Sequence, residues 1–327
     1  MKRIHIIATG GTIAMAHDEQ AGGAVIALSG ADFLQRLLGQ TDAELPEITE
    51  EEYGPLPSSH FSVEHLWGLR QRVAEAVASP EVDGVVVTHG TDSLEETAYL
   101  LDLTVPGDKP MVVTGAMRIA SEPGYEGIAN VLSAVRVAAS DGARGLGALV
   151  ALNDEIHAAR DVTKMNTLAP NTFQSPFAGP LGRVDGGMVR IERCVERQII
   201  ACPRLEPRVY LFKLAVGMDA ELLRQALGLG ARGVVVESFG GGRVPPWWMQ
   251  AMVDASAQGV PVAVTTRCPS GILYDPYTYV GAYHDLLQAE FLLAHGLNGQ
   301  KARLRLMAVL GATRDADEVR RLFQIPA

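Results

Sequence analysis

The chain has 327 residues, a length that favours two domains because a single hydrophobic core seldom grows so large. Apolar residues make up 47% and charged residues 20%, which is ordinary for a globular protein in water. The net charge of −10 disfavours binding to nucleic acid or to an anionic membrane surface. No apolar stretch reaches the roughly 18 residues of a membrane-spanning helix.

The cysteines and the N-terminus indicate a compartment. Cys194, Cys202 and Cys268 lack the spacing of a zinc site or a disulfide framework. The first apolar stretch, "IHII", is too short for a signal peptide and runs directly into a glycine turn. We therefore expect a cytoplasmic protein with no metal site.

Short apolar runs rich in valine and isoleucine alternate with helical patterns. Such runs are typical of strands buried on both faces of a parallel sheet, and the alternation predicts a doubly wound α/β fold. Strands are predicted within residues 3–10, 83–90, 109–116, 147–152, 208–214, 232–240 and 261–268. Helices are predicted within residues 33–40, 63–78, 93–103, 128–140, 219–230 and 246–259.

The alternation stops between about residues 170 and 208. Residues 170–187 are loop-like in composition, and 188–200 resemble antiparallel strands. We expect a larger N-terminal catalytic domain with a mostly parallel sheet (1–190), a linker (191–208) and a smaller C-terminal α/β domain (209–327).

In a doubly wound sheet, ligands bind to loops at the carboxyl ends of strands. Gly10 and Gly11 break the first strand and place the Thr12 hydroxyl at the mouth of a turn. After the next predicted strand, "THGTDSLEE" at residues 88–96 places Thr91 and Asp92 at a helix N-terminus. Such a position favours a bound carboxylate or an oxyanion.

Ser93 and Glu96 of the same motif form an S-x-x-E pattern that predicts a capping box.

Two further loops follow strands. The small residues of "GAMR", 115–118, leave backbone N–H groups exposed, as an oxyanion hole requires. Lys164 lies in "ARDVTKMNT", 159–167, beyond a fourth strand. Taken singly, these residues are better explained as turns, caps or a solvated lysine.

Other motifs do not compete. "GLGARG" at residues 228–233 has the spacing of a dinucleotide-binding loop, but it follows a helix and precedes a strand, which is the wrong context. The sequence contains no Walker A, H-E-x-x-H or G-x-S-x-G pattern.

Taken together, the four loops are specific. "ATGGTIA" at 8–14 and "THGTDSLEET" at 88–97 resemble the two signature motifs of the bacterial L-asparaginase family. "VTGAMR" at 113–118, "ARDVTKMNT" at 159–167 and "KARL" at 301–304 follow in the family's order. The "SS" at 58–59 stands where the family has its substrate-binding serine. The resemblance spans nearly the whole chain.

The resemblance implies hydrolysis of L-asparagine to L-aspartate and ammonia without a metal or organic cofactor. It implies that Thr12 is the nucleophile and forms a β-aspartyl ester. Thr91, Asp92 and Lys164 would form a second group that moves protons and activates water. It also implies a homotetramer built from dimers, in which a neighbour's C-terminal domain completes each site.

The same resemblance implies how the substrate is held. Asp92 would pair with the α-ammonium group, and Ser58 and the helix terminus with the α-carboxylate. Backbone N–H groups near Thr91 and Ala116 would hold the oxyanion. The expected substrate-binding set is Gly11, Ser58, Ser59, Gly90, Thr91, Asp92 and Ala116.

The chain departs from the family in the mobile loop after the first motif. Many members carry a tyrosine there, but residues 16–30 contain none, and Ala24 falls near its expected position. Gly22 and Gly23 would still let this loop act as a lid.

The family's partner-subunit acid has no clear counterpart in the C-terminal segment 267–285. That segment instead concentrates four tyrosines. We expect one of them, Tyr274 or Tyr279, to supply the missing hydroxyl to a neighbour's site. The alternative is that they only pack a loop.

Four functional hypotheses share these motifs. L-asparaginase leads, and a glutaminase-asparaginase of broader specificity is the alternative. The amidase subunit of a transfer-RNA amidotransferase is disfavoured because such subunits carry an N-terminal extension. A non-catalytic amino-acid-binding protein on the same scaffold is disfavoured because Thr12, Thr91, Asp92 and Lys164 are all present.

Overall fold

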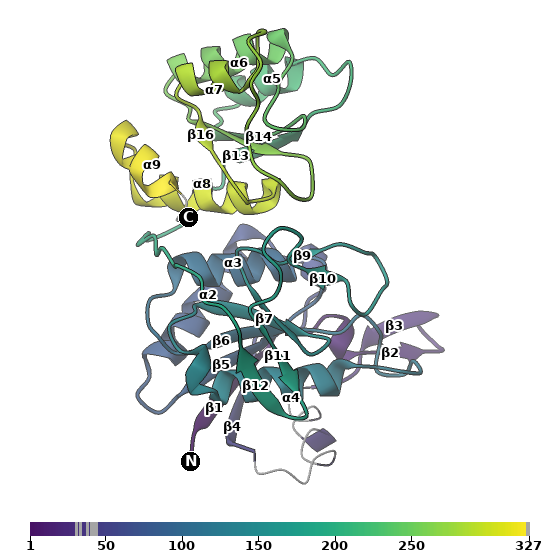
Figure 1. Ribbon diagram of the computed structural model, residues 1–327. Coiled ribbons are helices and arrows are strands. Elements are labelled where there is room, and N and C mark those ends of the chain that lie inside the picture. The colour runs from purple at the N-terminus through teal and green to yellow at the C-terminus, as the bar shows by residue number, and fades with distance from the viewer. Residues whose placement is uncertain (30–31, 33–34, 37–38, 40–44, 325–327) are drawn as a thin grey trace. The chain divides into compact units, whose positions relative to one another are not determined.

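A computed structural model describes residues 1–29, 32, 35–36, 39 and 45–324 (Figure 1). The chain divides into two units, Met1–Ile199 and Ile200–Ala327. The expected class is confirmed, since the first unit has a large, mostly parallel sheet and the second a smaller parallel sheet with helices. The bounds that we propose for the linker, residues 191–208, include the position where the units change.

The first unit is built on an eight-stranded sheet. Five of its strands run parallel, and three antiparallel strands extend one side. In spatial order the strands are β12 (Met188–Ile191), β11 (Gly182–Asp185), β8 (Glu155–Ala158), β7 (Ala148–Leu152), β6 (Met111–Thr114), β5 (Gly84–Thr88), β1 (Arg3–Ala8) and β4 (Glu47–Glu52).

Helices cover both faces of this sheet, with α4 (Gly127–Ala139) on one face and α2 (Val63–Ala78) and α3 (Leu94–Thr104) on the other (Figure 1). Successive strand residues point to opposite faces, so a strand buried on both sides must be apolar at nearly every position. Val86 packs toward α4, whereas Val85 and Val87 belong to the cluster under α2 and α3.

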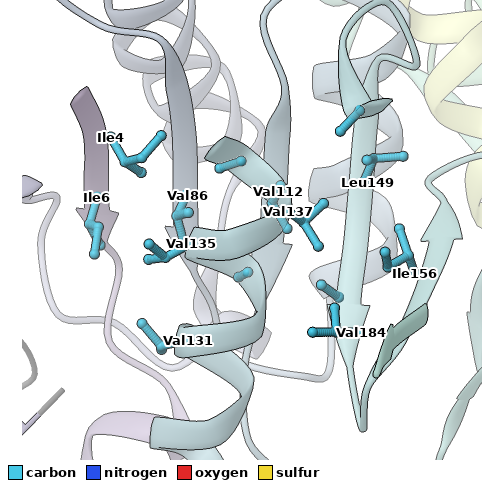
Figure 2. Packing of buried hydrophobic residues seen from close by; sticks show 14 of the residues in the cluster. Ile4, Ile6, Val86, Val112, Val131, Val135, Val137, Leu149, Ile156 and Val184 are labelled. Carbon is cyan, nitrogen blue, oxygen red and sulfur yellow. The ribbon is translucent and has the colours of Figure 1, made fainter. Parts of the chain in front are cut away.

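The α4 side of this core is shown in Figure 2. Val131 and Val135 of α4 are four residues apart and therefore share one face of the helix. They belong to one buried cluster with strand residues such as Ile4, Val112 and Leu149. Because β1, β5 and β6 are neighbours held by this core, the loops after them meet at one edge of the sheet.

Smaller elements connect the main strands and helices. They are the 3-10 turns η1 (Thr12–Ala14), η2 (Ser58–His60) and η3 (Asp141–Ala143), the hairpin β2 (Met15–Asp18) and β3 (Gly23–Ile26), and the pair β9 (Thr163–Lys164) and β10 (Phe173–Gln174). Part of the loop expected over 170–187 is therefore strand, and antiparallel pairing after it ends at Ile191 rather than continuing to residue 200. The helix expected at 33–40 falls largely outside the described residues.

The second unit has a parallel sheet in the order β13 (Val209–Lys213), β14 (Gly233–Ser238), β15 (Val262–Thr266) and β16 (Leu292–Leu293). One face carries α5 (Glu221–Gly228), α6 (Pro246–Ala257) and α7 (Tyr283–Gln288), and the other carries α8 (Gly299–Ala312) and α9 (Ala316–Phe323) (Figure 1). Across the described residues, no helix is both long and apolar enough to cross a membrane.

Candidate active site

The turn after β1 touches the turn after β5. Gly10 and Gly11 have φ angles of +82° and +84°, a conformation in which other residues are strained. A Cβ added to Gly11 would lie 2.4 Å from the Cα of Gly90, so only glycine permits this approach. Thr12 begins η1 directly after this contact and is partly exposed. The paired glycines thus bring the Thr12 turn against the Gly90–Thr91 loop.

Ser58 lies on the other side of Gly90. A Cβ added to Gly90 would lie 2.7 Å from Ser58 Oγ, and Ser58 is buried. The Ser93 hydroxyl donates a hydrogen bond of 2.8 Å to the Ser58 carbonyl and makes no cap bond to α3, so the predicted capping box is wrong. Ser59 is exposed. Ser58, rather than Ser59, therefore lies against the glycine contact.

Lys164 bridges the two polar residues that follow β5. Its Nζ donates to Thr91 Oγ1 at 3.0 Å and to Asp92 Oδ1 at 2.8 Å. Thr91 is buried, whereas the side chains of Lys164 and Asp92 are 17% and 66% exposed. The lysine is therefore not the solvated surface charge that its sequence context alone allows. Its Nζ joins a buried hydroxyl to a carboxylate open to solvent.

A carboxylate that the sequence did not single out holds Lys164 in place. Glu95 is buried in the first turn of α3, and its Oε1 accepts bonds from Thr163 Oγ1 at 2.9 Å and from the Lys164 N–H at 3.4 Å. The same helix start therefore positions Thr91 directly and Lys164 through Glu95. The adjacent glutamates of "LEE" after the second motif are the only hint of this in the sequence.

His89 forms a hydrogen bond that fixes the Gly90 peptide. It is fully buried, and burial lowers its pKa to about 4, so its imidazole is neutral near pH 7. With a proton on Nδ1, the ring donates to the Gly90 carbonyl at 2.8 Å and accepts from Thr97 Oγ1 at 3.0 Å. Both ring nitrogens are thus occupied in fixing the loop.

The loop after β6 completes this edge. A Cβ added to Gly115 would lie 2.5 Å from the His89 carbonyl and 3.4 Å from Thr91 Cγ2. Ala116 is fully buried. Neither its N–H nor that of Thr91 donates to an acceptor in the part of the chain that the structure describes. These two donors are available to a bound oxygen atom.

The segment that lacks the expected tyrosine forms the β2–β3 hairpin. His17 pairs with Ala24 across it, and Ala24 is exposed. Ala24 therefore presents only a methyl group in the hairpin, near the position at which the family resemblance places a tyrosine.

The C-terminal tyrosines lie in the second unit. Tyr277 stacks on Tyr279 with ring centroids 5.4 Å apart, and Tyr274 meets Tyr283 edge-on at 5.9 Å. Tyr274 and Tyr279 are 60% and 52% exposed. Among the residues that the structure describes, no group of three or more His, Cys, Asp or Glu side chains could hold a metal ion.

Two threonine hydroxyls, a lysine amine and a carboxylate, in loops beside one edge of a mostly parallel sheet, are typical of an α/β hydrolase. Comparison with known families agrees with this class. A model described as "Asparaginase, N-terminal" matches residues 3–197, and one described as "Glutaminase/Asparaginase C-terminal domain" matches residues 208–323. The chain belongs to the asparaginase family.

Individual relatives cover the whole chain. An L-asparaginase of Bacillus licheniformis is 34% identical over 96% of this chain and 97% of its own length. A glutaminase-asparaginase of Pseudomonas fluorescens biotype A is 33% identical over 99% of this chain and 90% of its own. The crystal structure of a probable cytoplasmic L-asparaginase from Campylobacter jejuni superposes with a TM-score of 0.86 at 30% identity, over 99% of each chain.

Proposed function

We propose that this enzyme hydrolyses the side-chain amide of L-asparagine to L-aspartate and ammonia through a threonyl acyl-enzyme. The observation that carries the proposal is the Lys164 bridge to Thr91 and Asp92, next to the glycine contact that bears Thr12. Membership of the asparaginase family and relatives named as L-asparaginases support the same activity.

The proposed reaction has two steps. In the first, Thr12 Oγ1 attacks the amide carbon, its proton passes to the leaving nitrogen, and ammonia departs from a β-aspartyl ester. In the second, a water molecule attacks the ester and gives its proton to Thr91 Oγ1 as the Thr91 proton passes to the Lys164 amine. That proton is returned to Thr12 Oγ1 as the ester C–O bond breaks, which releases aspartate and restores the Thr12 hydroxyl. The N–H groups of Thr91 and Ala116 would stabilise the oxyanion in both steps.

Ammonia release tests the activity. Purified protein is assayed with L-asparagine and L-glutamine, each with and without a chelator. We expect release from asparagine that the chelator does not change. Glutamine turnover at a comparable kcat/KM would support the alternative of a glutaminase-asparaginase, which a relative bearing that name favours. Amino-acid binding without ammonia release would refute hydrolysis and leave a binding protein.

Asp92→Asn tests which group recognises the substrate's α-ammonium. The variant should lose preference for asparagine over succinamic acid, which lacks that amine. We expect the preference for asparagine to fall by about 2 kcal/mol, or roughly thirtyfold. This is the low end of the range for a charge pair, because the Asp92 side chain is largely exposed to solvent. The measurement is the ratio of kcat/KM for the two substrates, which cancels any shared effect of the lost Lys164 contact. An unchanged ratio would show that the amine is bound elsewhere.

We propose that Tyr274 or Tyr279 supplies a phenol to the site of a neighbouring subunit. Their exposure supports the idea, since a hydroxyl that serves another copy must be accessible. Single Tyr→Phe changes delete only the hydroxyl, and one of these two should lower kcat about a hundredfold. Tyr277→Phe and Tyr283→Phe in the same cluster are the matched controls. If all four variants keep the parent kcat, the Thr91–Lys164–Asp92 group must suffice.

We also propose a homotetramer built from dimers and a cytoplasmic location. The absence of disulfides among the three cysteines and the name of the Campylobacter protein support the location, although one curated relative is named as periplasmic. Light scattering of the purified protein and fractionation of the source cells test these two points separately.

A further inference from the structure

The segment between β6 and α4 runs alongside the turn that bears Thr12. The Ala120 N–H donates to the Met15 carbonyl at 2.7 Å, and the His17 N–H donates to Ser121 Oγ at 3.0 Å. The Tyr125 phenol donates to the Ile13 carbonyl at 2.6 Å. The loop that contains Ala116 is therefore attached, a few residues later, to the turn that contains Thr12.

Tyr125 makes the attachment closest to Thr12. Its ring packs against the buried cluster under α4, and burial raises the pKa of the phenol well above its usual range, so it stays a donor. Its acceptor belongs to Ile13, a fully buried residue in the middle of η1. A buried carbonyl that loses its donor costs free energy, so this bond favours one orientation of the peptide next to Thr12.

Glu126 holds the other loop. Its Oε1 accepts the N–H of Met117, and its Oε2 is buried with no hydrogen-bond partner among the described residues. One helical turn later, Asn130 Nδ2 donates to the Gly115 carbonyl at 2.9 Å. Residues at the start of α4 therefore form hydrogen bonds to both ends of the stretch Gly115–Met117. The Met117 N–H is paired, whereas the Ala116 N–H between these two bonds donates to no acceptor among the described residues and is available to a ligand.

We propose that Tyr125 and Glu126 are positioning residues for the reaction, a role that rests on the proposed function. Tyr125 orients the turn that bears the nucleophile, and Glu126 orients the peptide that bears an oxyanion donor. Because the two residues are adjacent at one helix start, they set the spacing between nucleophile and oxyanion hole. Small errors in that spacing are costly, since a displacement of about 1 Å can cost on the order of a hundredfold in rate.

The Tyr125→Phe variant tests this. It keeps the ring in its core and removes only the donor to Ile13. We expect kcat for asparagine to fall by about tenfold or more, with KM changed by less than about twofold. A misplaced nucleophile weakens stabilisation of the transition state more than it weakens substrate binding. Tyr53→Phe is the matched control. Tyr53 Oη donates to the His65 carbonyl at 2.9 Å, the same kind of bond in the same unit, and this variant should behave like the parent.

Changes at Glu126 provide an independent test. Glu126→Met removes the acceptor at similar size and should lower kcat as Tyr125→Phe does, whereas Glu126→Gln keeps an oxygen for Met117 and should restore most of it. Parent-like kcat in both Tyr125→Phe and Glu126→Met would overturn the proposal, as would losses that match a lower folded fraction in thermal unfolding. A parent chain that releases no ammonia would refute the proposed function and this role together. An active parent with equally active variants would refute only the positioning role.

Discussion

The Thr12→Ala variant is expected to lose asparagine hydrolysis by several orders of magnitude. An amide is a poor electrophile, and without a hydroxyl at this position no β-aspartyl ester can form. The turn itself should survive, because its conformation is set by Gly10, Gly11 and the bond from the Ala14 N–H to the Gly11 carbonyl. The measurement is the steady-state rate of ammonia release, with folding checked by thermal unfolding.

Thr12→Ser is the control for this change, since it keeps a hydroxyl and should retain measurable turnover. If a folded Thr12→Ala variant still turns over asparagine at close to the parent rate, another residue must be the nucleophile.

Thr91→Val should reduce kcat by several orders of magnitude while leaving substrate binding largely intact. Valine keeps the branched shape in a buried position and removes only the hydroxyl that accepts from Lys164. Losing a group that handles protons in the reaction slows turnover more than it weakens ground-state binding. The measurements are kcat from ammonia release and asparagine affinity from calorimetry in a Thr12→Ala background.

Thr104→Ala is a matched control from the other end of α3. Its buried hydroxyl donates to the Leu100 carbonyl at 2.7 Å, so its loss should cost stability rather than kcat. Equal kcat losses in the Thr91 and Thr104 variants would mean that Thr91 serves only the fold.

The parts of the fold that followed from the sequence are those dictated by burial. The runs that form β5, β6 and β7 are apolar at nearly every position because both faces of each strand are covered, and β1 contributes a shorter apolar run that ends at Ala8. The loops after β1, β5 and β6 could therefore be placed at one edge, which is where Thr12, Thr91 and Ala116 lie.

Other elements carry no such pattern. β4 has the sequence "EITEEE" and lies exposed at the edge of the sheet. Its glutamates therefore give no apolar pattern from which a strand could be predicted. α8 is buried over most of its surface, including Lys301 and Arg305, and so shows no polar face for periodicity to detect.

Contacts between residues far apart in the sequence also could not be predicted from local patterns. Lys164 reaches Thr91 across 73 residues of sequence, and Tyr125 reaches Ile13 across 112. Both depend on which strands and helices become neighbours. The family resemblance suggested the first contact, because Lys164 matches a family motif, but nothing in the sequence pointed to Tyr125 or Glu126.

The identity of the nucleophile is tested most directly by trapping the intermediate. The parent enzyme and the Thr91→Val variant are mixed with asparagine, quenched in acid and digested, and the peptides are examined by mass spectrometry. We expect one aspartyl group attached to Thr12, enriched in the variant because its second step is blocked. An aspartyl group on Thr91 in the parent, or ammonia release with no modified Thr12 in either protein, would contradict this expectation.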